Sequence, residues 1–276
     1  MNRRSILAGG AALTAPNLSH ASTPRDPTVS PYPVETRTGP RGSTHYAPAG
    51  IASAPAVLLL HGSEGGNSRW SHVTAIFLAT QGFVAAPFPY SRGGNIHHAG
   101  DIVEVELDET AEALRLLRAH EGVSGAVGLW GISRGAEHAL LLTSLMASEG
   151  DTDLPGAVAV HAPSDVIVPG FVAAHYVPNY RSRVDLSKPA WRWRGTPLES
   201  GTPIEVERYA GPLLLGHGEE DPVWPADRTR RLEARLRAAG RTPEVHYYPG
   251  EGHGLRPAAA NLDRARLSAF FRRHLA

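Results

Sequence analysis

A serine between two glycines is the residue of this chain best suited to act as a nucleophile. Gly131, Ser133 and Gly135 fit the pattern Gly-x-Ser-x-Gly. Residues 126–130, just before it, form an apolar run short enough for a buried strand, and residues 139–146 are apolar enough for a buried helix. A strand, a sharp turn and a helix around this pattern present the serine hydroxyl at the turn, and the glycines leave room for it. The sequence therefore predicts that Ser133 is a nucleophile. The alternative is a glycine-rich turn with an idle serine.

A serine hydroxyl needs a base, and the base needs a group that orients it. Asp221 and His253 each lie in a loop that follows a strand-like apolar run, and the chain order is Ser, Asp, His. This order, with each residue after a strand, is typical of a triad on a parallel sheet. We predict Asp221 as the orienting acid and His253, in a glycine-rich loop after the last predicted strand, as the general base. Glu219 and Glu220 are rival acids, and Asp221 could instead begin a turn before the proline that follows it.

The oxyanion that forms during acyl transfer needs two N–H donors held in place. The first expected donor is the backbone N–H of Arg134, which follows the nucleophile at the start of the predicted helix. The second is expected from residues 61–66, His-Gly-Ser-Glu-Gly-Gly, whose glycines permit a close approach. We predict the N–H of Ser63 in this role, with Glu64 as the alternative. A plain glycine turn is the competing interpretation of this loop.

Apolar runs alternate with amphipathic stretches along most of the chain. Continuous apolar runs predict strands covered on both faces, and apolar residues three or four positions apart predict helices. Strands that alternate with helices imply right-handed crossovers and a mainly parallel, doubly wound α/β sheet with helices on both faces. The predicted strands are residues 43–48 (an edge strand), 56–60, 83–86, 126–130, 157–160, 212–216 and 245–248, and the predicted helices are residues 68–82, 101–120, 139–146, 226–239 and 258–274.

One long segment, residues 166–209, interrupts this alternation with prolines and aromatic residues. So long a loop in a compact domain is often functional, so we predict a cap or lid over the site; a surface excursion packed by its own aromatic residues is the alternative. Trp191 and Trp193 of this segment, together with Trp224, are expected to contact substrate. Four arginines of the segment could attract an anionic substrate or form a solvated face: Arg181, Arg183, Arg192 and Arg194.

Composition and charge exclude several other classes of protein. Lys+Arg and Asp+Glu are both 27, so nothing in the net charge indicates a nucleic-acid or membrane-surface partner. Cysteine is absent, which excludes disulfides and thiolate metal sites. His97, His98 and Asp101 could bind a cation, but no metal site is predicted, because adjacent histidines usually point apart and no third ligand suggests itself. No glycine-rich phosphate loop indicates a nucleotide cofactor. His138 and His217 are expected to pack or form hydrogen bonds near the site.

The first residues resemble a twin-arginine export signal. Arg3 and Arg4 precede a short apolar stretch, residues 6–13, and a small-x-small cleavage pattern follows at residues 19–21. The expected organisation is an export signal at 1–21, an N-terminal arm at 22–50 and one domain at 51–276. The apolar stretch is too short to span a membrane. We therefore expect a periplasmic or secreted protein, or a cytoplasmic one if the signal is not used.

Taken together, these motifs resemble those of the α/β-hydrolases. More narrowly, the chain resembles the catalytic domain of the acyl-CoA thioester hydrolase and bile acid-CoA:amino acid N-acyltransferase family, which is related to the dienelactone hydrolases. The resemblance implies an α/β-hydrolase fold, with Ser133, Asp221 and His253 as nucleophile, acid and base. The transferases of this family use a cysteine, which this chain lacks, so hydrolysis is favoured over amino-acid conjugation. The resemblance covers about residues 55–275 and is carried by the stretches 61–66, 131–137, 193–195, 218–225 and 248–254.

The predicted function is thus that of a serine hydrolase without a cofactor. It would cleave carboxylic esters or acyl thioesters of small molecules through an acyl-enzyme. An exported peptidase or a polysaccharide esterase on the same fold is the alternative enzyme, since one triad serves many acyl groups. A non-catalytic binding protein that kept the fold is the alternative outside enzymes, although no triad member is missing from the sequence.

Overall fold

The structure of the protein, a computed structural model, describes residues 32–39, 43–66, 69–92, 100–173 and 183–275. The predicted export signal, most of the predicted arm, His97, His98 and Arg181 lie outside these residues. Among the helices that the structure describes, none is both long enough and apolar enough to cross a lipid bilayer.

Eight of the described strands form one sheet in the order β1-β2-β4-β3-β6-β7-β12-β13. β2 pairs antiparallel with both β1 and β4, and every other pair of neighbours is parallel. The predicted, mainly parallel sheet is therefore confirmed. The strands are β1 (Val34–Thr38), β2 (Thr44–Pro48), β3 (Ala54–Leu60), β4 (Val84–Phe88), β6 (Val123–Ile132), β7 (Ala157–His161), β12 (Leu213–Gly218) and β13 (Glu244–Tyr248).

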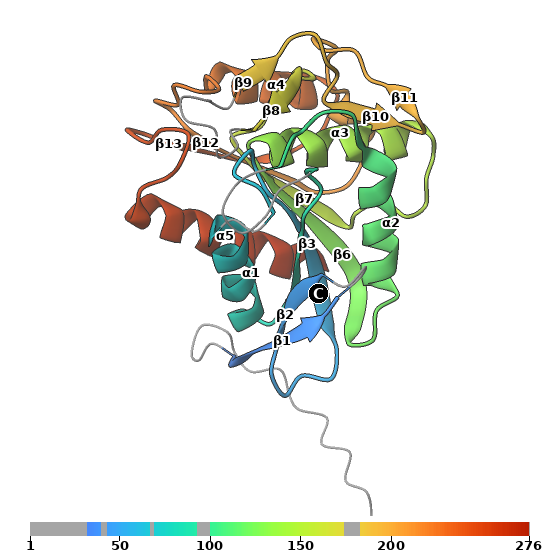
Figure 1. Ribbon diagram of the computed structural model, residues 1–276. Coiled ribbons are helices and arrows are strands. Elements are labelled where there is room, and N and C mark those ends of the chain that lie inside the picture. The colour runs from blue at the N-terminus through green and yellow to red at the C-terminus, as the bar shows by residue number, and fades with distance from the viewer. Residues whose placement is uncertain (1–31, 40–42, 67–68, 93–99, 174–182, 276) are drawn as a thin grey trace, which may run out of the picture.

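Helices cover both faces of this sheet, as predicted. α1 and α5 pack on one face, and α2 and α3 pack on the other (Figure 1). α4 contributes Leu232 and Leu236 to the same core as α3. The helices are α1 (Arg69–Thr80), α2 (Leu107–Arg118), α3 (Arg134–Ser148), α4 (Asp227–Ala238) and α5 (Pro257–Leu275).

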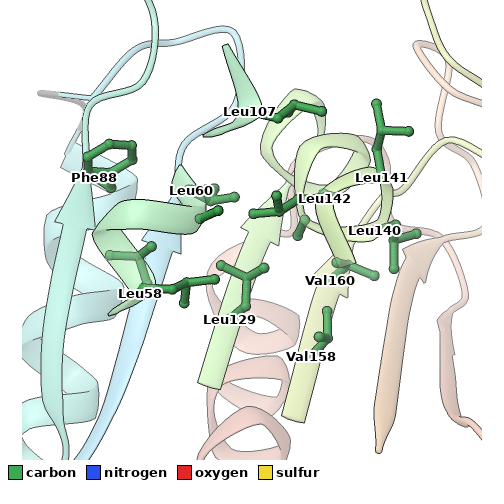
Figure 2. Close-up of a cluster of buried hydrophobic side chains, with 14 of the residues drawn as sticks. Leu58, Leu60, Phe88, Leu107, Leu129, Leu140, Leu141, Leu142, Val158 and Val160 are labelled. Atoms are coloured by element: carbon green, nitrogen blue, oxygen red, sulfur yellow. The ribbon is translucent and has the colours of Figure 1, made fainter. Parts of the chain in front are cut away.

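The apolar runs of the central strands fill two separate cores. In β3, Leu58 and Leu60 belong to the core on the α2/α3 face, whereas Val57 and Leu59 belong to the core on the α1/α5 face. These four side chains are at most 2% exposed, and burying one such side chain contributes about 1.5–3 kcal/mol. Figure 2 shows Leu58 and Leu60 in the first of these cores, beside leucines of α3. A strand buried on both faces has no polar side, which explains the unbroken apolar run.

One local prediction at the start of the chain is corrected by the structure. Residues 34–38, predicted as part of an extended arm, form β1, the edge strand, so β2 lies one position inside the sheet. The helix predicted near residue 70 forms as α1, but Trp70 and Ile76 on it are 53% and 40% exposed. Small residues such as Ala75 and Ala79 lie against the sheet instead, because they allow a closer approach of helix and sheet.

The long helix predicted from Asp101 begins six residues later, at Leu107. The residues before it extend and pair with other segments: Asp101 bridges to Arg92, and Ile102 bridges to Phe171. The two-residue strand β5 (Val105–Glu106) then pairs in parallel with a strand of the segment 166–209. Tertiary pairing therefore takes these residues out of the predicted helix.

The segment 166–209 contains short strands rather than an unstructured loop. β8 (Gly170–Val172) pairs antiparallel with β9 (Arg183–Asp185), and β10 (Trp191–Trp193) pairs with both β5 and β11 (Thr196–Pro197). A 3-10 helix, η2 (Val206–Arg208), follows and contributes Val206 to the core beneath α3. We call residues 163–209 the insert; they begin shortly after β7 and end just after η2. Several of its described residues pack into the core on the α2/α3 face of the sheet: Ile167, Trp191, Trp193, Ile204 and Val206.

Candidate active site

Ser133 lies at a strained turn between β6 and α3. Its φ is 53° and its ψ is −118°, a left-handed conformation that is costly for any residue with a side chain. A Cβ atom on Gly131 would lie 2.1 Å from the carbonyl oxygen of Gly135, and a Cβ on Gly135 would lie 2.2 Å from that of Leu60. Neither position therefore accepts a side chain. The predicted strand, turn and helix are confirmed, and the reason for the two glycines is this backbone contact.

The structure brings Ser133, His253 and Asp221 into one hydrogen-bonded chain. The Nε2 atom of His253 lies 2.8 Å from Oγ of Ser133, and its Nδ1 lies 2.7 Å from Oδ2 of Asp221. Because a carboxylate only accepts, the proton of the neutral imidazole belongs on Nδ1, and Nε2 is free to accept from the serine hydroxyl. This is the arrangement a serine needs in order to lose its proton to a base.

Asp221 is buried and is held by four hydrogen-bond donors. Its Oδ1 accepts the backbone N–H groups of Val223 and Trp224 at 2.7 and 2.9 Å, and its Oδ2 accepts from His253 and, at 3.2 Å, from His217. Burial on its own would raise the pKa of Asp221, but hydrogen bonds from His217, His253 and the N–H of Trp224 outweigh it and lower the pKa well below the ordinary value. Asp221 is therefore ionised across the whole neutral range.

His217 fixes the acid rather than reacting itself. Its Nε2 lies 2.8 Å from the carbonyl oxygen of Trp224 as well as near Asp221, so this nitrogen carries the proton. Its Nδ1 then accepts from the hydroxyl of Thr229 at 2.7 Å. The expectation that His217 forms hydrogen bonds near the site is confirmed.

The loops that carry the acid and the histidine touch each other at a glycine. A Cβ on Gly218 would lie 2.2 Å from the carbonyl oxygen of Gly252, so only glycine lets the two backbones meet. The rival acids Glu219 and Glu220 are exposed, and Glu219 pairs with Arg230 instead of with His253. Of the three acidic residues in this loop, Asp221 is the one that bonds His253.

The loop after β3 approaches the nucleophile closely. A Cβ on Gly62 would lie 3.2 Å from Cβ of Ser133, and Ser63 and Glu64 both line the cavity beside Ser133. The N–H of Gly62 already donates to the carboxylate of Glu64 at 2.9 Å. Arg134 begins α3, where the first N–H groups of a helix have no intrahelical acceptor. The residues predicted to supply the oxyanion donors, Arg134 and Ser63 or Glu64, therefore lie beside Ser133.

A buried ionic network joins the first turn of α3 to the insert. Glu137, fully buried, accepts from Nη1 of Arg134 at 2.9 Å, from the N–H of Val168 at 2.7 Å and from the indole N–H of Trp191 at 2.8 Å. Nη2 of Arg134 also donates to the carbonyl oxygen of Pro169 at 2.8 Å. The Ser-Arg-Gly-Ala-Glu stretch thus holds the insert to the nucleophile turn, a role that the sequence did not reveal.

The three tryptophans predicted to bind substrate do not line the cavity beside Ser133. Trp191 is fully buried in the network above, and the indole N–H of Trp193 donates to Glu149 at 2.7 Å. Trp224 lies edge-on to the imidazole of His253, with ring centroids 6.0 Å apart. The indole N–H groups of Trp191 and Trp193 are thus bonded to glutamates, and the ring of Trp224 lies against His253 and Arg228, so the three rings support the elements that carry the site. Arg192 pairs with Glu104 and Glu106, and Arg194 pairs with Glu149.

The cavity beside Ser133, of about 200 Å³, opens on the α1/α5 face of the sheet. Its apolar lining comes from α1, the end of β6 and the start of α5. Its polar lining includes His161, the last residue of β7, and Asp263 of α5. Sequence reasoning missed these two residues. For His161 an indication existed, since it directly follows a predicted strand. The apolar lining residues are Trp70, Trp130, Ile132, Leu255 and Ala260.

An aromatic cluster packs beneath the nucleophile turn on the other face. The rings of His61 and Tyr90 stack at 4.0 Å, and the hydroxyl of Tyr90 donates to the carbonyl oxygen of His61 at 2.7 Å. His138 lies against both Tyr90 and Trp191. The expectation that His138 is a packing residue is confirmed. Burial lowers the pKa of His61 to about 4, against a weaker opposing effect of its bond to the carbonyl of Gly62, so this imidazole is neutral at pH 7.

Comparison with known proteins shows which family this chain is similar to. The sequence profile described as BAAT / Acyl-CoA thioester hydrolase C terminal matches residues 105–276. Two mouse proteins are similar in sequence. Acyl-coenzyme A thioesterase 5 is 29% identical over 238 residues, and peroxisomal succinyl-coenzyme A thioesterase is 24% identical over 244 residues. Each alignment covers 81% of this chain and 54% of the mouse protein, so the chain spans about half the length of these relatives.

The fold is that of the α/β-hydrolases. The crystal structure of an alpha/beta hydrolase enzyme from a Medee basin deep-sea metagenome library superposes with a TM-score of 0.56 at 15% sequence identity. The superposition covers 88% of this chain and 98% of that enzyme. The predicted fold class is therefore confirmed.

Proposed function

This chain belongs to the BAAT/acyl-CoA thioester hydrolase family, and we propose that it is a serine hydrolase that cleaves acyl thioesters, and also carboxylic esters, through an acyl-enzyme. The observation that carries the proposal is the chain of hydrogen bonds from Oγ of Ser133 to His253 at 2.8 Å and from His253 to Asp221 at 2.7 Å. A hydroxyl, an imidazole and a buried carboxylate at these distances are the components of nucleophilic acyl transfer.

In the proposed reaction, Oγ of Ser133 attacks the acyl carbonyl carbon while Nε2 of His253 takes the hydroxyl proton. The N–H groups of Arg134 and Ser63 donate to the oxyanion of the tetrahedral intermediate. The intermediate collapses, the proton on Nε2 passes to the leaving thiol or alcohol, and the acyl group remains on Ser133. Water, deprotonated by His253, then attacks the acyl-enzyme and releases the acid. Asp221 keeps the imidazole in the Nδ1–H tautomer and stabilises the imidazolium that forms.

We propose thioesters as the preferred substrates, ahead of oxygen esters, because of the family and the names of its members. The two mouse relatives are thioesterases by name. Since they are about twice as long as the aligned region, the specific acyl groups they act on are not transferred to this chain. The same triad chemistry serves both leaving groups, so a direct comparison with one acyl group decides the preference.

Active-site labelling tests the proposal at its first step. A fluorophosphonate probe should label the wild-type protein and should not label Ser133→Ala. Ser148→Ala is the matched control, because Ser148 lies on the surface at the other end of α3, and it should label like the wild type. Absence of labelling on folded wild-type protein would reject the serine-hydrolase proposal and favour a binding protein.

Turnover of matched substrates tests the remaining steps. With thioester and oxygen-ester substrates that share one acyl group, Ser133→Ala should lose at least about a thousandfold in kcat. Asp221→Asn should lose up to about ten-thousandfold, because the amide favours the wrong imidazole tautomer. Full activity of Asp221→Asn would contradict the role of Asp221. Faster hydrolysis of peptide or sugar-ester substrates would favour the alternative enzymes.

A further inference from the structure

The floor of the cavity beside Ser133 contains a histidine that the proposed reaction does not use. His161 ends β7 and stands opposite Ile132 in the register of β6 and β7, and its carbonyl oxygen accepts the N–H of Ser133 at 2.9 Å. The side chain lines the cavity and is almost entirely buried. Among the described residues, neither of its ring nitrogens has a hydrogen-bond partner. A buried imidazole without partners carries an unfavourable desolvation cost, which a bound group could remove.

Asp263 of α5 lies next to this histidine. Its Oδ1 is 3.7 Å from Nδ1 of His161, which is longer than a hydrogen bond, and it accepts the hydroxyl of Tyr248 at 2.8 Å. A Cβ on Gly216 would lie 3.1 Å from both the His161 nitrogen and the Asp263 oxygen, so the glycine leaves space where these groups face each other. Burial alone would raise the pKa of Asp263, but its contacts with His161 and Tyr248 outweigh it and lower the pKa, so this carboxylate stays charged.

We propose that His161 and Asp263 form a polar subsite beside Ser133 that receives a hydroxyl group on the acyl part of the substrate. The inference rests on the proposed function and names its substrate class, a short hydroxyacyl thioester or ester. A hydroxyl donates one hydrogen bond and accepts others, so it can bond an imidazole nitrogen and a carboxylate oxygen together. The subsite lies one strand away from the nucleophile, which places the hydroxyl close to the reacting carbonyl.

Charge and burial argue against the two nearest alternatives to a hydroxyl. A carboxylate at the end of the acyl group would meet Asp263, and Glu64 also lines the cavity. One cation, Arg264, lines the same wall, and it already donates to Asn261 at 2.5 Å. A plain alkyl chain would leave His161 without partners. A site built to bond a hydroxyl rejects the analogue that lacks it far more strongly than an apolar pocket rejects an extra methylene.

Three four-carbon acyl groups on one leaving group test the subsite: butanoyl, 3-hydroxybutanoyl and succinyl thioesters of N-acetylcysteamine. With the full chain, kcat/KM for 3-hydroxybutanoyl should exceed that for butanoyl by at least about tenfold, and succinyl should be the poorest. In His161→Phe the ratio of hydroxybutanoyl to butanoyl should fall to about one, and His161→Gln, which keeps hydrogen-bonding atoms, should recover part of it. Asp263→Asn should improve succinyl relative to butanoyl.

His138→Phe is the matched control, because the buried ring nitrogens of His138 also have no hydrogen-bond partner in the described part of the chain, but its ring packs against Tyr90 and Trp191 on the opposite face of the sheet. It should keep the wild-type ratio. Equal rates for hydroxybutanoyl and butanoyl in the wild type, or a ratio unchanged by His161→Phe, would overturn the subsite while leaving the serine hydrolase intact. If no thioester is turned over, calorimetric binding to Ser133→Ala decides separately: the hydroxybutanoyl thioester must bind more tightly than the butanoyl thioester, and equal binding rejects the subsite.

Discussion

On the α3 side of Ser133, Glu137 accepts three hydrogen bonds, whereas on the α5 side neither ring nitrogen of His161 has a partner among the described residues. Both residues are buried, and each lies near the end of a strand at the site: Glu137 five residues after β6, and His161 as the last residue of β7. The α3 side is covered by described residues of the insert, among them the fully buried Trp191. The α5 side contains the cavity, with the half-exposed Trp70 at its edge.

The difference suits the two sides to different tasks. The α3 side keeps the backbone around Ser133 in place, and the α5 side provides the cavity for the proposed substrate. A fully bonded buried network gives rigidity, and breaking it is costly because its charges cannot reach water. On the α5 side, the buried polar atoms without hydrogen bonds and the exposed apolar surface lower the stability of the free protein. A bound ligand can offset this loss by supplying hydrogen bonds and covering the apolar surface. Substitutions on the α3 side should therefore change stability, and substitutions on the α5 side should change substrate selection.

The largest effect should come from removing the centre of the bonded network. Glu137→Ala leaves Arg134 as a buried charge without its partner and should reduce the free energy of unfolding by about 3–5 kcal/mol. Urea unfolding monitored by circular dichroism measures it. Glu149→Ala is the comparison, because Glu149 also bonds a tryptophan and an arginine of the insert but is partly exposed. That variant should cost only about 1 kcal/mol, and an equal loss in both would contradict the importance of burial.

A smaller loss of stability should follow from deleting one bond of the network. Trp191→Phe removes the indole N–H that donates to Glu137 while keeping an aromatic ring, and should cost about 1–3 kcal/mol. KM for ester and thioester substrates should stay the same, because Trp191 does not line the cavity. A raised KM at unchanged stability would return Trp191 to the substrate-contacting role that the sequence suggested.

The opposite result is expected for Trp70, the more exposed of the two tryptophans that line the cavity. Trp70→Ala should raise KM about five- to tenfold, since it removes apolar surface at the cavity, and should change stability by less than about 0.5 kcal/mol. Steady-state kinetics and urea unfolding on the same samples separate the two effects. Val73→Ala, on the same exposed side of α1 but outside the cavity lining, should leave KM unchanged. If both variants raise KM equally, the cavity does not bind the acyl group.

The last prediction concerns the acid side of the stability profile. Burial, with the nearby His61 and the charge of Arg134, lowers the pKa of His138 to about 3, from an ordinary value of 6.5. Because the unfolded chain binds the proton first, stability contributed by neutral His138 is complete above pH 6.5 and is lost as the pH falls toward 3. His138→Phe should therefore lose less stability than the wild type between pH 6.5 and 4. Exposed His274→Phe should follow the wild-type profile, and parallel curves for all three would contradict the assignment.

Local patterns in the sequence determined the nucleophile turn, the sheet and the order of the triad. Gly131 is required because its backbone contacts Gly135, four residues along the chain, and Gly135 is required because its backbone contacts the end of β3. The motif itself therefore encodes the turn. Buried strands reveal themselves as apolar runs because both of their faces are covered. Asp221 was predictable as the acid for a similar reason, since it follows a strand whose end lies at the same sheet edge as Ser133.

Only the tertiary structure decided which side of the site is open to substrate. Aromatic composition favoured Trp191 as a substrate contact, but the ring turns into the core because Glu137, on a different element, accepts its N–H. Trp70 is half-exposed on α1 and lies at the cavity. His161 and Asp263 come from β7 and α5, and no local pattern links them. Their meeting depends on strand register and on which sheet face α5 covers, and these are set by the packing of the whole chain.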